Sequence, residues 1–146
     1  MPRRLINDII AGSKLVTATL DVTVRSACRT MAENRIGAIL VVQGGRIAGI
    51  FTERDALNQV LAGNLDPDAT TLDKVMVAHP QTIRGDRPLA HALHMMADGG
   101  FRHVPVVDAD GGPLGMVSAR DALGEDLVDL ERDLRRRDEL EGSIGY

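Results

Sequence analysis

The chain has 146 residues, 44% of them hydrophobic and only 2% aromatic, which predicts a globular protein with an aliphatic core. Its length allows one domain, or two very small ones that share a core. The formal net charge of -4 at pH 7 argues against general nucleic-acid binding, because such binding requires a basic surface.

Hydrophobic periodicity predicts the secondary structure of the first half. Apolar residues at helical spacing indicate helices, whereas alternating or wholly apolar runs rich in β-branched residues indicate strands. The expected elements are a partly helical lead-in over 1–13, a strand over 14–20, a helix over 22–34, strands over 38–42 and 46–51, and a helix over 53–62. Between the two later strands, Gln43-Gly44-Gly45 is typical of a hairpin turn.

The second half predicts the same order of elements. The expected elements are a short helix or turn over 72–77, a strand over 81–84, a helix over 88–98, strands over 104–107 and 113–117, and a helix from residue 119. Leu123, Leu127, Leu130 and Leu134 keep helical spacing, which predicts that the last helix is long. Residues 142–146 are expected to fray.

Two stretches of the chain repeat each other. Residues 24–42 correspond to residues 89–107 at an offset of 65, and the offset becomes 66 after a one-residue insertion in a turn. In both copies apolar residues fall at i, i+3, i+4, i+7 and i+8, as on one face of an amphipathic helix. Each copy ends in the motif Gly-apolar-apolar-Thr/Ser-x-Arg-Asp, at residues 49–55 and 115–121.

The repeat predicts an α/β (α+β) fold of two β-α-β-β-α units with about 60 residues each. A unit of this size is marginal alone, so we expect the two to pack on each other with approximate two-fold symmetry. The motifs would then face a common cleft. The expected organisation is a lead-in at 1–13, a first repeat at 14–66, a second repeat at 67–125 and a charged C-terminal helix or tail at 126–146.

The repeated motif has the pattern of a strand end, a sharp turn and a helix start. Free backbone N–H groups and the positive end of the helix dipole gather at such a point and favour an anion such as phosphate. The alternative is that Thr52 with Asp55, and Ser118 with Asp121, are ordinary capping boxes. Both interpretations can hold for the same residue.

Other candidate side chains favour neither a metal site nor catalysis. His91 and His94 lie three residues apart on a helix, but no cysteine or close third ligand completes a set. Cys28 takes a core position in the apolar stripe, which predicts a buried and inert thiol. The sequence contains no recognisable nucleophile–base pair or carboxylate cluster for a catalytic metal, so an enzyme such as a nucleotide hydrolase is the least favoured interpretation.

The cellular compartment is predicted from what the sequence lacks. A single cysteine excludes an internal disulfide and fits a reducing compartment. No apolar run approaches the length of about 18 residues that a membrane span needs. Asn7 and Asp8 interrupt the start of the chain too soon for the apolar region of a signal peptide. We therefore expect a soluble cytoplasmic protein.

These motifs are similar to those of a known family. The duplicated Gly-apolar-apolar-Thr/Ser-x-Arg-Asp pattern after a Val-Val hairpin resembles the CBS domain, a tandem pair of which is called a Bateman module. Asn34–Val42 and Gly100–Asp108 resemble the first and second repeats of small bacterial stand-alone CBS-pair proteins. The resemblance covers about residues 14–125.

The resemblance implies a regulatory sensor of energy or redox state without catalysis of its own. Its ligand would be an adenosine compound such as AMP, ADP, ATP, NAD or S-adenosylmethionine, bound in the cleft between the repeats. The module would form a homodimer and signal to a separate effector protein. The alternative is a scaffold for dimerisation or protein interaction, whose clefts are empty or degenerate and whose C-terminal helix is the working surface.

The resemblance also implies two shared sites, in which the motif aspartate accepts hydrogen bonds from both ribose hydroxyls. The residues implied for the first site are Thr52, Arg54, Asp55, Gln81, Thr82, Arg102 and His103. Those implied for the second are Lys14, Val16, Thr17, Ile36, Gly37, Ala38, Ser118, Arg120 and Asp121. An adenine ring is expected among aliphatic side chains such as Ile36, Ile50, Val104 and Met116.

The two expected sites differ in charge. Arg102 and His103 would face the phosphates in the first site, which therefore favours a phosphate-rich ligand. Gly37 and Ala38 would form a floor that lets a base or sugar approach the backbone closely in the second site. We therefore expect two related sites that are not equivalent.

Overall fold

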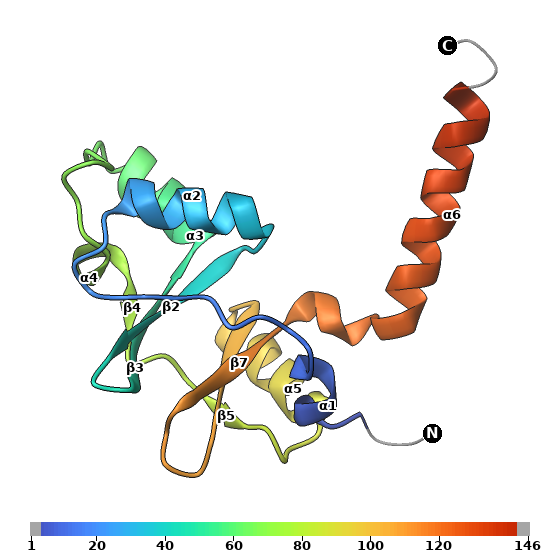
Figure 1. The fold of residues 1–146 in the computed structure, drawn as a ribbon, viewed down its shortest axis with the longest axis horizontal. Helices are drawn as coiled ribbons and strands as arrows, with labels where there is room; N and C mark the ends of the chain where they lie inside the picture. The colour runs from blue at the N-terminus through green and yellow to red at the C-terminus, as the bar shows by residue number, and fades with distance from the viewer. Residues whose placement is uncertain (1–3, 143–146) are drawn as a thin grey trace.

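Two small β-sheets organise residues 4–142, the part of the chain that the structure, a computed structural model, describes (Figure 1). The first sheet has the strand order β1-β2-β3-β4 and the second has the order β5-β6-β7. The strands of the first sheet are β1 (Thr17–Ala18), β2 (Ala38–Gln43), β3 (Arg46–Thr52) and β4 (Val77–Ala78). Those of the second are β5 (Ile83–Arg84), β6 (His103–Val107) and β7 (Pro113–Ser118).

Helices precede, connect and follow these strands. They are α1 (Ile6–Ile10), α2 (Val24–Asn34), α3 (Glu53–Asp55), α4 (Leu72–Val75), α5 (Leu89–Gly99) and α6 (Gly124–Gly142). A π-helical segment, η1 (Ala56–Leu61), continues α3, and a 3₁₀ turn, η2 (Ala119–Ala122), precedes α6. The element order confirms the mixed α/β class predicted from the repeats.

The two sheets have matching strand pairings. In each, a two-residue strand pairs in parallel with a central strand, which in turn pairs antiparallel with the following one. Both antiparallel pairs are irregular at equivalent points, between Val41 and Val42 in the first sheet and between Val106 and Val107 in the second. The repeat detected in the sequence is therefore also a repeat of backbone geometry.

Each unit buries a mainly aliphatic core between its sheet and its helices. In the first unit, Met31 of α2 packs in one cluster with Phe51 of β3. In the second, Met96 of α5 packs in one cluster with Val117 of β7. All four side chains are buried. The burial of the two methionines agrees with the apolar stripes predicted for their helices.

A third apolar cluster joins the two units. Ala38, Leu40 and Ile50, on the opposite face of the first sheet, pack with Met116 of β7. Pro105, which holds the position of Leu40 in the second repeat, is fully buried. The two sheets therefore meet through strands that the repeat relates to each other, in agreement with the expected packing.

The short helices α1 and α4 each pack against the unit that does not directly follow them in the chain. Leu72 of α4 belongs to the first core, and Ile6 of α1 belongs to the second. The Leu72 N–H donates to the carbonyl of Val22 over 2.9 Å, and the Ile6 N–H donates equivalently to the carbonyl of Arg87 over 3.0 Å. Residues around α4, which were expected to belong to the second repeat, thus complete the core of the first unit.

Several elements differ in detail from the prediction. β1 is only two residues long, and β4 was not expected. The helix predicted over 53–62 is one α-helical turn that widens into a π-helix. The last helix begins as a 3₁₀ turn and becomes α-helical at Gly124, whose φ of +51° bends the chain between the two. Gly142 ends α6, and the remaining residues of the predicted frayed end lie outside the described part.

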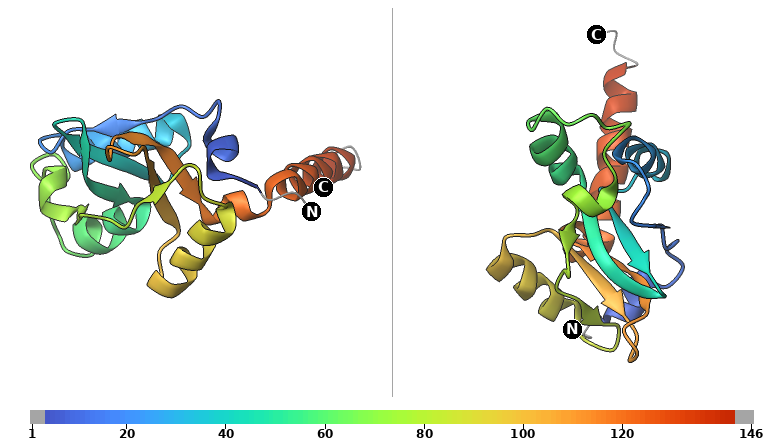
Figure 2. Two further views of the ribbon diagram at one scale, coloured as in Figure 1. Left: turned by 90° about the horizontal axis from the view of Figure 1, so that it is seen from below. Right: turned by 90° about the vertical axis from the view of Figure 1, so that its left-hand side faces the viewer.

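Helix α6 extends away from both units, which is seen from three directions (Figures 1 and 2). Leu134 and Leu140 are exposed on it. Within residues 4–142 no helix combines the length and apolar character that crossing a bilayer requires.

Candidate functional site

A cavity of about 910 Å³ lies between the first motif and the second unit. We call it the Asp55 cavity. Its lining combines the end of β3, the start of α3 and η1, the linker after β4, and the turn that leads from α5 into β6. The lining residues are Ile50, Thr52, Glu53, Arg54, Asp55, Leu57, Asn58, Val77, His79, Pro80, Gln81, Gly99, Gly100, Phe101, Arg102 and His103.

The structure brings together six of the seven residues predicted for the first site. Thr52, Arg54 and Asp55 come from the first repeat, whereas Arg102 and His103 come from the second. Gln81 also lines the cavity, but Thr82 does not. The cavity is therefore shared between the repeats, and a role of these residues in ligand binding stays a prediction.

The start of α3 forms a capping box around Thr52. Its backbone is extended, with φ -116° and ψ 164°, so the chain turns from β3 into α3 at this residue. The Asp55 N–H donates to Thr52 Oγ1 over 3.2 Å, and the Thr52 N–H donates to Asp55 Oδ2 over 3.0 Å. The capping interpretation of the motif is therefore confirmed.

The same contacts correct, for three of the four N–H groups of residues 52–55, the expectation that they are free. The Glu53 N–H donates to the carbonyl of Gly37 over 2.9 Å, so the N–H groups of Thr52, Glu53 and Asp55 all have protein partners. Local capping and the adjoining β2 segment satisfy donors that the motif alone left open. An anion in the Asp55 cavity would therefore have to be held mainly by side chains.

Two arginines are available for such a role. Arg54 and Arg102 are both exposed at the cavity, and neither makes an ion pair with a carboxylate among the described residues. A guanidinium without a carboxylate partner can form charge-assisted bidentate hydrogen bonds with phosphate. Glu53 and Asp55 contribute the opposing negative charges.

His103 lies where the two units meet. It begins β6 directly opposite Ser118, the cap of the second motif, and its side chain is half-buried. Burial lowers the pKa of His103 below its ordinary value of 6.5; the carboxylates of Glu53 and Asp121 oppose this shift, and Arg102 adds to it. The imidazole is therefore mainly neutral at neutral pH, facing carboxylates of both motifs.

Several cavity residues were missed in the sequence. Asn58 lies four residues after Arg54, and Phe101 adjoins Arg102, so local spacing could have indicated both. His79 has a left-handed backbone with φ +51° in the linker between the units, where no periodic pattern marks it. Glu53 occupies the variable position of the motif, so the motif did not indicate a role for it.

The second motif forms a similar cap with different surroundings. The Ser118 N–H donates to Asp121 Oδ2 over 2.8 Å, and a capping box is complete there as well. The Ala119 N–H donates to the carbonyl of Arg102 over 2.9 Å, which mirrors the bond from Glu53 to Gly37. Arg4 Nη1 donates to the Asp121 carbonyl over 2.8 Å, so the lead-in reaches this motif. Arg120 beside it is exposed.

The predicted floor of the second site is covered by protein. Ala38 is 4% exposed and packs in the cluster between the sheets. A Cβ placed on Gly37 would lie 3.0 Å from Glu53 Oε1 and 3.6 Å from His103 Nε2, so these two side chains stand over the glycine. Its role as a ligand-facing floor stays a prediction.

The other residues predicted for the second site are scattered between core and surface. Ile36 and Val16 pack against the core of the first unit, whereas Lys14 and Thr17 are exposed. Val104, expected beside an adenine ring, is fully buried in the second core because it points to the helix side of β6. The expectation for Val104 was therefore wrong.

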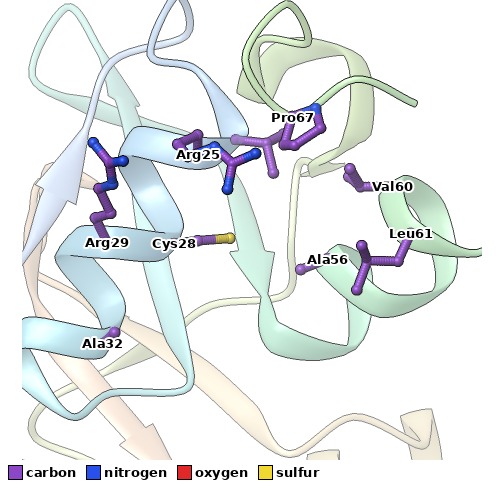
Figure 3. Close-up of a pocket in the computed structure, with 9 residues that line it drawn as sticks. Arg25, Cys28, Arg29, Ala32, Ala56, Val60, Leu61 and Pro67 are labelled. Carbon is purple, nitrogen blue, oxygen red and sulfur yellow. The ribbon is translucent and has the colours of Figure 1, made fainter. Parts of the chain in front are cut away.

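A smaller cavity of about 290 Å³ lies between α2 and η1 (Figure 3). Figure 3 shows the Cys28 sulfur directed into this space, with Ala56 and Leu61 on the facing helix. The side chain is half-buried, and burial raises the pKa of the Cys28 thiol. The thiol is thus protonated at neutral pH. It is less buried than the sequence predicted, and its inert role stays a prediction.

Within the described ranges, no three His, Cys, Asp or Glu side chains are arranged to hold a metal ion. His94 instead lies 3.1 Å from Asp98 on the exposed face of α5.

Comparison with known proteins identifies both repeats. The family model described as "CBS domain" matches residues 6–62 and 72–127. The CBS domain-containing protein CBSCBSPB3 of Arabidopsis thaliana is 35% identical over 103 residues, which are 70% of this chain. The chain spans only 18% of the length of that relative.

Solved structures of similar proteins share the fold along most of the chain. A protein with CBS domains from Burkholderia ambifaria is 31% identical, with a TM-score of 0.78 over 86% of this chain and 95% of that one. A CBS domain protein from Pyrobaculum aerophilum, complexed with AMP, is 26% identical, with a TM-score of 0.77 over 87% of this chain and 96% of that one.

Proposed function

The chain belongs to the CBS domain family, and on that premise we propose that it is a regulatory module that binds an adenosine nucleotide in the Asp55 cavity. Proteins of this kind are typically not catalysts, so the output would be a change in affinity for a separate effector protein. We propose further that two copies form the working dimer in the cytoplasm.

The observation that carries this proposal is the convergence of two repeats on one cavity. Asp55 supplies a carboxylate for a ribose diol, and Arg54 and Arg102 supply cations for phosphate. Ile50 and Phe101 add apolar surface for a base. A volume of about 910 Å³ accommodates a mononucleotide and leaves room for a larger ligand such as NAD.

The class of ligand is supported by the relative from Pyrobaculum aerophilum, which was solved with AMP. We therefore take AMP as the first probe, with ADP, ATP, NAD and S-adenosylmethionine as alternatives. A ligand that binds across two repeats stabilises their relative orientation, because its binding free energy depends on contacts with both.

Calorimetric titration of the purified protein with each compound tests this proposal, with GMP and adenosine as controls. We expect saturable binding of AMP or another adenosine ligand, and a higher melting temperature in its presence. GMP tests recognition of the base, and adenosine tests the contribution of phosphate.

Arg102→Ala removes a cation from the cavity without disturbing the core, since the side chain is exposed. Arg46→Ala is the matched control, because Arg46 is also exposed, lies at the far end of β3 and does not line the cavity. Weaker AMP binding in Arg102→Ala, together with unchanged AMP binding in Arg46→Ala, supports the proposal. A folded protein that binds none of the adenosine ligands would instead favour the scaffold alternative.

A further inference from the structure

His103 of the second unit and Glu53 of the first both lie beside Gly37, in an arrangement that the repeat does not duplicate. At the equivalent positions, the first repeat has Ala38 where the second has His103, and the second has Ala119 where the first has Glu53. The packing that brings Glu53 and His103 over Gly37 therefore corresponds to two alanines on the other side of the pseudo-two-fold relation. A titratable pair exists on one side only.

The pair is close but does not form an ion pair. A Cβ added to Gly37 would lie 3.0 Å from Glu53 Oε1 and 3.6 Å from His103 Nε2. No ion pair joins these two side chains among the described residues. Both side chains also line the Asp55 cavity. A change in the charge of His103 therefore acts directly on any anion in this cavity.

Charged groups of both signs surround His103, and their opposing effects on its pKa cancel only in part. The groups that bear on the imidazole or share its cavity are Glu53, Arg54 and Asp55 of α3, His79 of the linker, Arg102 before β6, and Asp121 of η2. Burial outweighs the attraction of the carboxylates and keeps the pKa of His103 below its ordinary value in the free protein. A bound phosphate brings further negative charge to the same cavity and opposes this effect.

We propose that the Asp55 cavity binds its anionic ligand together with a proton, which His103 takes up at the junction between the two repeats. This inference rests on the nucleotide-binding function proposed above and specifies how that site is regulated. The free imidazole is neutral, and the bound phosphate stabilises the imidazolium, so the affinity rises as the pH falls from 8 to 6. The cavity thus responds to ligand concentration and to acidity at once.

Calorimetric titration with AMP in two buffers of different ionisation enthalpy counts the protons taken up on binding. We expect the wild-type protein to take up more proton per AMP near pH 7 than His103→Gln, which keeps a neutral polar side chain of similar size. Between pH 8 and pH 6 the wild-type affinity should rise about fivefold more than that of His103→Gln. The comparison removes the titration of AMP itself, which is common to both proteins.

Three controls separate His103 from other groups. His79→Gln removes the second histidine of the cavity, and His91→Gln removes an exposed histidine of α5 that does not line it. Both should keep the wild-type proton uptake. Adenosine, which lacks the phosphate, should bind without the additional uptake.

The protonation of His103 can be measured directly in the wild-type protein. Nuclear magnetic resonance titration of the His103 imidazole in the wild-type protein should show its midpoint at higher pH with AMP bound than without. An unchanged midpoint, equal proton uptake by wild type and His103→Gln, or loss of the uptake in His79→Gln would each overturn the proposal. Those results leave nucleotide binding intact, whereas a wild-type protein that does not bind AMP overturns the AMP-binding proposal and this inference together.

Discussion

Asp55 Oδ2 lies 3.0 Å from the backbone nitrogen of Thr52 and 3.0 Å from its hydroxyl oxygen. One carboxylate oxygen therefore caps α3, while Oδ1 makes no hydrogen bond with the described residues. The same side chain can hold the helix start and present an oxygen to the cavity. The two interpretations of the motif are thus compatible at one residue.

Substitution of Asp55 should separate its two roles. Asp55→Ala loses the side-chain acceptor of the Thr52 N–H, half of the capping box, and should cost about 1 kcal/mol of unfolding free energy, whereas Asp55→Asn keeps such an acceptor. Both variants should lose AMP affinity by roughly tenfold or more, because a charged acceptor for the ribose is gone. Urea unfolding and calorimetric titration measure the two effects.

Asp121→Ala is the matched control for the capping role. It removes an equivalent capping box and should cost a similar unfolding free energy. The sequence predicts that the two sites are unequal, so its effect on AMP binding should differ in size from that of Asp55→Ala. Equal losses of AMP affinity in both variants would contradict the predicted inequality.

Arg102→Ala should weaken AMP binding by about fivefold while leaving adenosine binding unchanged, because an exposed cation–phosphate pair contributes roughly 1 kcal/mol. Added salt should reduce the difference between wild type and variant, since ions screen exposed charges. Titration at two salt concentrations checks this. An equal loss for adenosine would mean that Arg102 does not act through phosphate.

The two motif glycines should differ in their tolerance of alanine. A Cβ on Gly49 would lie 2.5 Å from Met76 Sδ and 2.9 Å from the Val77 carbonyl, because β4 passes close to β3 there. The three atoms nearest to a Cβ on Gly115 would all belong to the Ile10 side chain, at 3.2 Å or more. Gly49→Ala should therefore destabilise the protein by about 1–3 kcal/mol, and Gly115→Ala by less.

Urea unfolding of both glycine variants measures this difference. A smaller loss of stability in Gly49→Ala than in Gly115→Ala would show that the strands separate at little cost. Such a result would contradict a close pairing of β3 with β4 in solution.

His103 should make the free protein sensitive to mild acid. Because its pKa is lower in the folded state than the ordinary value of 6.5, the unfolded chain binds this proton first as the pH falls. Its contribution to stability is complete above that ordinary value and declines toward the lower folded pKa. The unfolding free energy of wild type should therefore fall more steeply between pH 7 and pH 5 than that of His103→Gln, in urea titrations without ligand.

Local patterns predicted much of the fold. The stripes of α2 and α5, the hairpins and the two capping boxes all depend on residues within a few positions of each other, so they can be recognised in the sequence. The duplication strengthened each prediction by repeating it. The grouping of the seven first-site residues, six of which line one cavity, came instead from the resemblance to a known family.

Features that depend on distant contacts were not predictable in this way. β4 contains only two residues and exists because Val77 and Ala78 pair with β3. The exchange of α1 and α4 between the units depends on which core each apolar face completes. The occupied N–H of Glu53 depends on the carbonyl of Gly37, sixteen positions earlier in the chain.

The sequence by itself determined that two related units exist, where each motif turns from strand to helix, and which side chains the resemblance implied for two clefts. Only the tertiary structure decided that Glu53 and His103 stand over Gly37, that Ala38 is buried between the sheets, and that His79 joins the first cavity. The reason is physical: periodicity and capping are short-range properties of the chain. The charge and shape of a site between two units depend instead on how their surfaces are brought into contact.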